Sequence, residues 1–217
     1  MIKEGLRNIV TSGLLLAGFA LLSVLILALV YAQTEERIKD NQRQALLKQL
    51  GEILPAETYD NILDQRKITL PLAAFNTKKP VQVYLATQQD KAVAAVFMIT
   101  TMRGYSGAIK LLIGVNQDQT LSGVRVVSHK ETPGLGDQID IAKSDWIRNF
   151  QHKSLQNPEP SAWAVKKDQG EFDQFTGATI TPRAIVATVK QVLQWSQLHF
   201  DELFTTKYHH NSTAAKP

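Results

Sequence analysis

The amino-acid sequence predicts an α+β protein: a single N-terminal transmembrane helix, then one domain with an antiparallel sheet and a long C-terminal helix. Three observations lead to this prediction. Residues 9–32 are almost all apolar, short apolar runs separated by polar turns lie between residues 68 and 127, and residues 182–204 carry apolar side chains at helical spacing. Strands that are grouped, instead of alternating with helices, are typical of α+β domains.

The same patterns divide the chain into four parts. Residues 1–33 are assigned to a cytoplasmic N-terminal end and the transmembrane helix, and residues 34–79 to a helical stalk and lead-in. Residues 80–205 are assigned to the folded domain, and the polar residues 206–217 to a disordered tail.

The apolar segment of about 24 residues would extend ~36 Å as a helix, which exceeds the ~30 Å hydrocarbon core of a bilayer. The alternative is a cleaved signal peptide with Val30-Tyr31-Ala32 as its cleavage site, but such apolar regions usually have only about 7–15 residues. Lys3 and Arg7 precede the segment. We therefore expect a cytoplasmic N-terminus and a domain across the membrane, which in a bacterium means an inner-membrane protein with a periplasmic domain.

Beyond the membrane segment, residues 35–54 are predicted to form a helix that ends near Pro55. Five short apolar runs then predict five strands, and the polar turn Gln88-Gln89-Asp90 predicts a hairpin between the second and the third. The predicted strands cover residues 68–70, 81–86, 91–100, 109–115 and 121–127.

The part of the chain after these strands is predicted to be mainly helical. A helix is expected over residues 138–150, followed by one further short strand over residues 161–165. The final helix is expected to run from Pro182 to about Phe204, with Thr181 as its N-cap.

Composition excludes several classes of function. The net charge of +4 is spread along the chain and not gathered into a basic patch, so nucleic-acid binding is not expected. The chain has no Cys, which excludes Fe–S clusters, thiolate metal sites and Cys nucleophiles. It also lacks a G-x-G-x-x-G nucleotide fingerprint. We predict no catalytic residue and no metal ligand.

The segment from Asp173 to Thr181, Asp-Gln-Phe-Thr-Gly-Ala-Thr-Ile-Thr, carries the strongest functional signal. Gly177 and Ala178 are small enough to let the backbone approach a bulky group. Thr179 follows them and lies just before the N-terminus of the predicted helix, whose free N–H groups and dipole favour an anion such as a phosphate. The alternative is a plain turn before a capped helix.

A second motif, His-Lys-Glu-Thr-Pro-Gly-Leu-Gly-Asp, occupies residues 129–137. Gly134 and Gly136 permit positive φ and a close approach of the backbone to another group. The alternative is a plain turn between a strand and a helix. Glu131 in this motif is expected to be a solvated loop carboxylate more often than a proton donor.

Both motifs, in this order, resemble those of the FMN-binding domain family, and the resemblance extends over about residues 80–200, including Arg103-Gly104-Tyr105-Ser106-Gly107. It implies that an FAD-dependent flavin transferase attaches FMN through its phosphate to the Thr179 hydroxyl. With FMN there, we expect the glycine loop to lie along the flavin ring, and Lys166 either to place positive charge nearby or simply to be exposed. The implied cofactor-binding residues are Thr176, Gly177, Ala178, Thr179, Thr181, Glu131, Thr132, Gly134, Leu135, Gly136 and Lys166.

Within this family the chain resembles the subunits of Rnf-type electron-transport complexes. That resemblance implies an electron relay, not a complete enzyme, that works with other membrane subunits. The complex would link electron transfer between ferredoxin and nicotinamide to ion transport, or to reduction of a redox regulator. One alternative is the C subunit of the sodium-translocating NADH:quinone reductase, for which the chain is short. An alternative of another class is a cofactor-free, membrane-anchored binding module.

Overall fold

The computed structural model describes residues 2–75 and 77–205. Residues 206–217, for which a disordered tail is predicted, lie outside the described residues. The described residues form two compact units, which divide between Leu46 and Leu47. The second unit therefore includes residues 47–75 and 77–79, which the sequence analysis groups with the stalk and not with the folded domain.

Helix α1 (Ile2–Ile53) joins the predicted transmembrane segment and the predicted stalk helix without a break. No proline occurs before Pro55, so nothing interrupts the backbone hydrogen bonds until the last turn. The large apolar side chains from Ile9 to Tyr31 are each at least 53 % exposed. A helix that is apolar on all sides requires an apolar environment. Within the described part of the chain, α1 is the helix long and apolar enough to cross a membrane.

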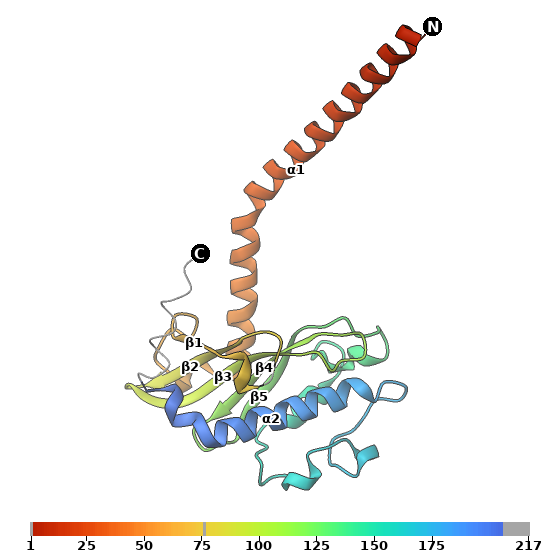
Figure 1. Ribbon diagram of the computed structural model, residues 1–217. Helices are drawn as coiled ribbons and strands as arrows, with labels where there is room; N and C mark the ends of the chain where they lie inside the picture. The colour runs from red at the N-terminus through yellow and green to blue at the C-terminus, as the bar shows by residue number, and fades with distance from the viewer. Residues whose placement is uncertain (1, 76, 206–217) are drawn as a thin grey trace. The chain divides into compact units, whose positions relative to one another are not determined.

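The sheet is an antiparallel meander in which each strand pairs with its sequence neighbour (Figure 1). All five predicted strands are confirmed, and each extends at most two residues beyond its predicted bounds. The turn between the second and third strands places Gln89 and Asp90 at positive φ, as a tight two-residue hairpin requires. The strands are β1 (Lys67–Leu70), β2 (Val81–Gln88), β3 (Lys91–Thr101), β4 (Ile109–Asn116) and β5 (Leu121–Ser128).

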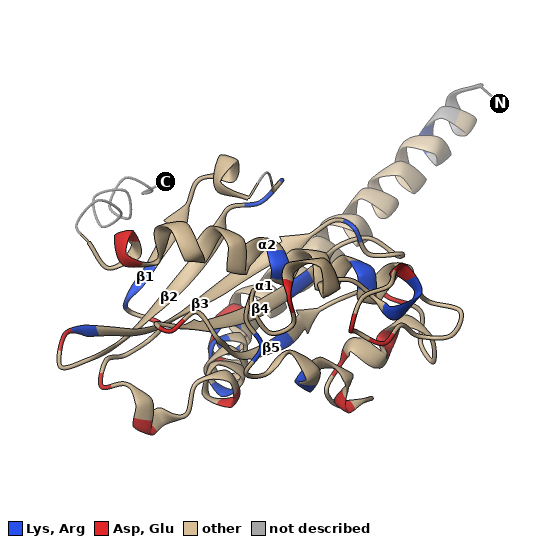
Figure 2. Cartoon of the chain, turned by 90° about the horizontal axis from the view of Figure 1, so that it is seen from below, with Lys and Arg blue, Asp and Glu red and all other residues tan. Residues whose placement is uncertain are grey.

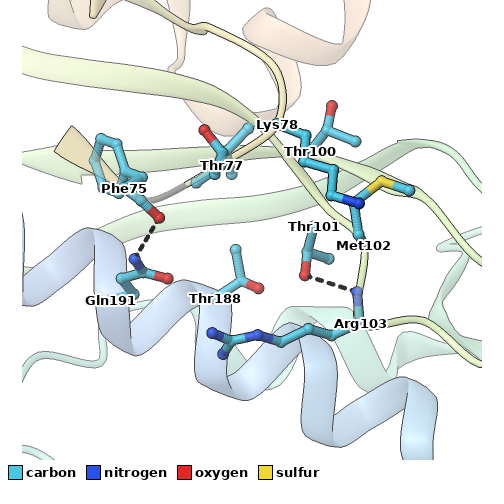
Figure 3. Close-up of a pocket in the computed structure, with 10 residues that line it drawn as sticks. Phe75, Thr77, Lys78, Thr100, Thr101, Met102, Arg103, Thr188 and Gln191 are labelled. Carbon is cyan, nitrogen blue, oxygen red and sulfur yellow. Dashed lines mark hydrogen bonds between the residues drawn. The ribbon is translucent and has the colours of Figure 1, made fainter. Parts of the chain in front are cut away.

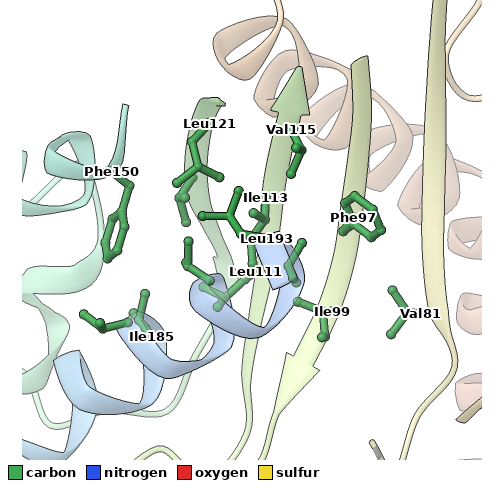
Figure 4. Close-up of a cluster of buried hydrophobic side chains, with 14 of the residues drawn as sticks. Val81, Phe97, Ile99, Leu111, Ile113, Val115, Leu121, Phe150, Ile185 and Leu193 are labelled. Carbon is green, nitrogen blue, oxygen red and sulfur yellow. The ribbon is translucent and has the colours of Figure 1, made fainter. Parts of the chain in front are cut away.

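Both faces of this sheet are covered. Helix α2 (Ile180–Leu203) lies along one face, where every second residue of the strands packs with it into the main core (Figures 1 and 4). The last turn of α1 covers the other face, where Leu50, Ile53 and Leu54 are buried. Burial on both faces explains why β3 is an almost unbroken apolar run instead of an alternating one.

Two glycines make room for the end of α1. Gly114 in β4 and Gly123 in β5 are paired across the sheet. A Cβ on Gly114 would lie 2.4 Å from Ile53 Cγ2 and 2.1 Å from Ser122 Oγ, and one on Gly123 would lie 3.8 Å from the Ile53 side chain. The paired glycines therefore form the hollow in which Ile53 is seated.

We expect Gly114→Ala to lower the free energy of unfolding by about 1–3 kcal/mol, because the added methyl group overlaps the buried Ile53 side chain. Gly51→Ala is the matched control, since a Cβ on Gly51 in α1 would meet nothing within 4 Å. Alanine favours a helix over glycine by about 1 kcal/mol, so this control should be neutral or stabilising. Chemical denaturation measures both variants, and equal stabilities would contradict the packing described.

The predicted helix over residues 138–150 is wrong. Two short 3-10 helices, η3 (Gly136–Ile139) and η4 (Asp145–Phe150), occupy the segment. Between them the Asp140 carboxylate and the Ser144 hydroxyl each accept a backbone N–H from two residues further on, at 2.9 and 3.1 Å. Such local side-chain hydrogen bonds offer the backbone an alternative to a continuous helix.

The predicted strand over residues 161–165 is also wrong. A 3-10 helix, η5 (Pro160–Ala162), occupies its start, and Val165 makes only an isolated bridge with Phe172. The remaining short 3-10 helices are η1 (Ala56–Thr58), η2 (Leu72–Ala74) and η6 (Lys166–Asp168).

Candidate functional site

The segment of the first motif turns sharply into α2. Gly177 has φ +78°, which favours glycine, and the Ala178 N–H donates to the Phe175 carbonyl at 3.1 Å. The helix starts at Ile180, so Thr179 takes the N-cap position that the sequence suggested for Thr181. The Thr179 side chain makes no capping hydrogen bond and is partly exposed. Its hydroxyl therefore lies at the N-terminal end of a long helix without a hydrogen-bond partner among the described residues.

The loop of the second motif lies against this turn. The Thr132 carbonyl accepts the N–H groups of Leu135 and Gly136, both at 3.1 Å, and Gly134 has φ +76°. This tight turn presents the Leu135 side chain, which is 42 % exposed. A Cβ on Gly177 would lie 3.6 Å from Leu135 Cδ2. The structure thus brings the two motifs into direct contact.

Glu131 is the centre of this contact and not a solvated carboxylate. Its side chain is 4 % exposed and accepts the hydroxyl proton of Thr181, which is fully buried in the first turn of α2. Its other oxygen accepts the Ser106 N–H at 3.0 Å. Glu131 therefore joins the glycine loop, the 103–107 loop and the start of α2.

Close packing around Glu131 accounts for two glycines. A Cβ on Gly136 would lie 3.0 Å from both Glu131 Oε2 and Thr181 Oγ1. A Cβ on Gly104 would lie 2.8 Å from Glu131 Oε1 and 2.4 Å from the Gly107 carbonyl. Side chains at either position would displace the carboxylate, which explains the glycine at each.

An ion pair holds the start of the first motif. Lys166 Nζ lies 2.6 Å from Asp173 Oδ1, and both side chains are more than half exposed. The Asp173 carbonyl accepts the indole N–H of Trp146 at 2.8 Å. Asp173 is therefore a structural residue at the start of the motif, tied down by its side chain and its backbone.

A second exposed pair links η6 to α2. The Arg183 guanidinium donates two hydrogen bonds of 2.5 Å to the Asp168 carboxylate. These hydrogen bonds lower the pKa of Asp168 and raise that of Arg183. The pair is therefore intact at neutral pH and is lost only as the pH falls through the lowered pKa of Asp168. Figure 2 shows that basic and acidic residues are interspersed over the domain.

The structure groups the predicted site residues unequally. Thr179, Gly177 and Leu135 border one exposed surface, whereas Glu131 and Thr181 lie buried behind it. The other motif residues divide between these settings: Thr132, Gly134 and Thr176 are exposed, Ala178 is partly buried, and Gly136 is buried. Lys166 belongs to the neighbouring ion pair.

Sequence reasoning missed two residues that build the site. The Ser106 N–H donates a hydrogen bond to Glu131. The only indication of this role in the sequence was the position of Ser106 in the 103–107 segment, between Gly104 and Gly107. Trp146 fixes the Asp173 carbonyl, and nothing in the sequence marks its position.

This surface fits a phosphate-bearing, partly apolar group such as FMN. Thr179 offers an unbonded hydroxyl at a helix N-terminus, where the helix dipole favours negative charge. Two large apolar side chains stand exposed beside it in the motifs, Leu135 at 42 % and Ile180 at 46 %. Exposed apolar side chains next to a polar attachment point suit a ligand with a charged end and a flat ring.

Comparison with known proteins agrees with this geometry. Residues 104–194 match the FMN-binding domain family, and residues 1–53 match the RnfG N-terminal region. The site thus belongs to an FMN-binding domain, as the two motifs predict.

Curated relatives define the family more closely. The chain is 44 % identical over 198 residues to the G subunit of the ion-translocating oxidoreductase complex of Pseudoalteromonas atlantica, covering 91 % of this chain and 92 % of the relative. It is 46 % identical to the protein of the same name from Pseudomonas aeruginosa, with the same coverage, and 40 % identical to that from Vibrio cholerae, covering 88 % and 92 %. The chain belongs to the family of these G subunits. The prediction of an Rnf-type subunit is confirmed, ahead of the C subunit of the sodium-translocating reductase.

Proposed function

We propose that this protein is an electron-relay subunit that carries FMN bound covalently to Thr179. The observation that carries the proposal is the free Thr179 hydroxyl at the start of α2, in contact range of the glycine loop through Gly177 and Leu135. The names of the relatives support a role within an ion-translocating oxidoreductase. When bound, FMN supplies one- and two-electron redox chemistry that the protein's own side chains lack.

The start of α2 suits a phosphodiester. Esterification leaves one negative charge on the phosphate, and a charge of that sign at a helix N-terminus is stabilised by roughly 0.3–1 kcal/mol. This energy orients a phosphate but is too small to retain a flavin. A covalent bond to Thr179 provides the retention, which matters most outside the cytoplasm.

The glycine loop would hold the ring. Leu135 offers an apolar contact, and the backbone turn from Thr132 to Gly136 can approach a flat group because Gly134 carries no side chain and faces open space. Lys166 already has a partner in Asp173, so its charge next to the flavin would be largely compensated.

Maturation requires a second protein. A flavin transferase would use FAD as donor: the Thr179 oxygen forms a bond to the phosphorus of the FMN half, the bond from that phosphorus to AMP breaks, and the hydroxyl proton is released. No base lies in hydrogen-bonding contact with Thr179 in the described structure, which is consistent with activation by the transferase and not by this chain.

The relay would work in an assembly. We place the domain in the periplasm, anchored by α1 in the inner membrane and in contact with other membrane subunits of the complex. These subunits would couple the electron flow to ion transport, or to reduction of a redox regulator. A cofactor-free binding module remains the contrary outcome of the experiments below.

The attachment is tested by co-expressing the full chain with a flavin transferase, denaturing it and separating it by gel electrophoresis. We expect a fluorescent band under ultraviolet light, and a peptide containing Thr179 whose mass is increased by FMN minus water. A dark band from co-expressed protein of the correct mass would refute covalent attachment.

The orientation is tested with a single cysteine, since the natural chain has none. Lys79→Cys introduces a thiol at an exposed position of the domain. We expect a membrane-impermeant maleimide to label it in cells whose outer membrane alone has been permeabilised. Labelling that appears only after the inner membrane is lysed would place the domain in the cytoplasm.

A further inference from the structure

A pocket lies on the domain, lined by residues that belong to neither of the two motifs. It is formed by the end of β3, by Phe75, Thr77 and Lys78, and by the middle of α2, and it has a volume of 140 Å³ (Figure 3). One water needs only about 10–15 Å³, so a small polyatomic ion fits. The polar lining of the pocket includes Lys78, Thr101, Arg103 and Thr188.

The charge of this pocket is positive and uncompensated. Lys78 and Arg103 line it, and neither side chain forms an ion pair with any described residue. No Asp or Glu is among the lining residues. In Figure 3 the Arg103 side chain extends along α2 below Thr188, while Lys78 reaches over the pocket from the other side. Two cations that share a cavity without an anion favour a negatively charged ligand.

Hydroxyl groups complete the lining. Thr101 is 7 % exposed, and its hydroxyl oxygen accepts the backbone N–H of Arg103 at 3.3 Å. The hydroxyl proton of Thr101 has no acceptor among the described residues. Thr188 is 3 % exposed, and its hydroxyl donates to the Ala184 carbonyl at 2.7 Å. The Thr101 proton is therefore available to an acceptor that enters the pocket.

We propose that this pocket binds a small oxyanion, a phosphate or carboxylate group, between Lys78, Arg103 and the Thr101 hydroxyl. Charge-assisted hydrogen bonds from a guanidinium and an ammonium suit the oxygens of such a group. The site is separate from that of the first motif, because Thr188 lies seven residues, about 10 Å, along α2 from Thr181. The proposal does not depend on FMN.

The test uses the full chain in detergent, with Thr methyl groups labelled for NMR. Inorganic phosphate and succinate are titrated separately at constant ionic strength, with sodium chloride as the reference salt. We expect the Thr101 and Thr188 methyl signals to shift saturably with at least one oxyanion, and not with chloride. Response to phosphate alone, or to succinate alone, identifies which oxyanion the pocket prefers.

Matched variants locate the site. Lys78→Gln and Arg103→Gln should each weaken binding about tenfold, the loss expected for one charge-assisted hydrogen bond. Lys79→Gln is the control, since Lys79 is the exposed neighbour of Lys78 but does not line the pocket, and it should leave the affinity within about twofold. The proposal would be overturned if the methyl signals shift without saturating, or if chloride causes the same shifts. It would also be overturned if Lys79→Gln weakens oxyanion binding as much as Lys78→Gln does.

Discussion

Thr179→Ala is expected to abolish the covalent flavin of this protein while leaving its fold intact. The Thr179 side chain makes no capping hydrogen bond and is partly exposed, so its loss removes no buried contact. Because an N-cap Thr that forms no such bond contributes little, we expect stability to change by less than about 0.5 kcal/mol. Flavin fluorescence in a denaturing gel and the midpoint of chemical denaturation measure the two effects separately.

The controls distinguish the attachment residue from its neighbours. Thr176→Ala removes an exposed hydroxyl three residues away and should leave the band fluorescent. Thr179→Ser keeps a hydroxyl at the same position and should retain some attachment. If the Thr179→Ala band still glows, the flavin is attached elsewhere, and the same gel assay on Thr176→Ala and Thr181→Ala would find it.

The sheet was predictable from the sequence because its signals are local. Each strand is an apolar run ended by polar turn residues, and the hairpin at Gln89 and Asp90 follows from such a turn. Covering both sheet faces makes those runs stand out further. The prediction of one helix up to Phe150 was wrong for an equally local reason. The apolar residues of this segment have helical spacing, but the side chains of Asp140 and Ser144 accept hydrogen bonds from nearby backbone N–H groups, and two short 3-10 helices form in place of one continuous helix.

The site was predictable in its motifs but not in its internal contacts. The motif pattern marked Thr179 and the glycine loop. The partnership of Glu131 with Thr181 spans fifty residues and exists only once α2 has packed against the sheet. Sequence periodicity carries no information on such a contact, and a loop carboxylate is on average exposed. Glu131 was therefore expected in solvent and is found buried.

Glu131→Ala is expected to lower the free energy of unfolding by about 3–5 kcal/mol, because it leaves the buried Thr181 hydroxyl and the Ser106 N–H without a partner and opens a cavity. Glu171→Ala is the matched control. Glu171 forms an ion pair with Lys153 and is 47 % exposed, so its loss should change stability by at most about 1 kcal/mol. Chemical denaturation of the flavin-free protein measures both variants.

Glu131→Gln separates hydrogen bonding from charge. The Gln side chain can still accept the Ser106 N–H through its oxygen and donate to the Thr181 oxygen through its nitrogen, so about 1–2 kcal/mol should be lost instead of the full amount. A double-mutant cycle of Glu131→Ala with Thr181→Val then isolates the contact between the glycine loop and the helix. Because the two residues share a buried hydrogen bond, we expect a coupling energy of about 0.5–3 kcal/mol. A coupling near zero would mean that Glu131 stabilises each segment independently. A clear coupling would mean that it fixes the glycine loop to the start of α2, and so holds the two motifs in register.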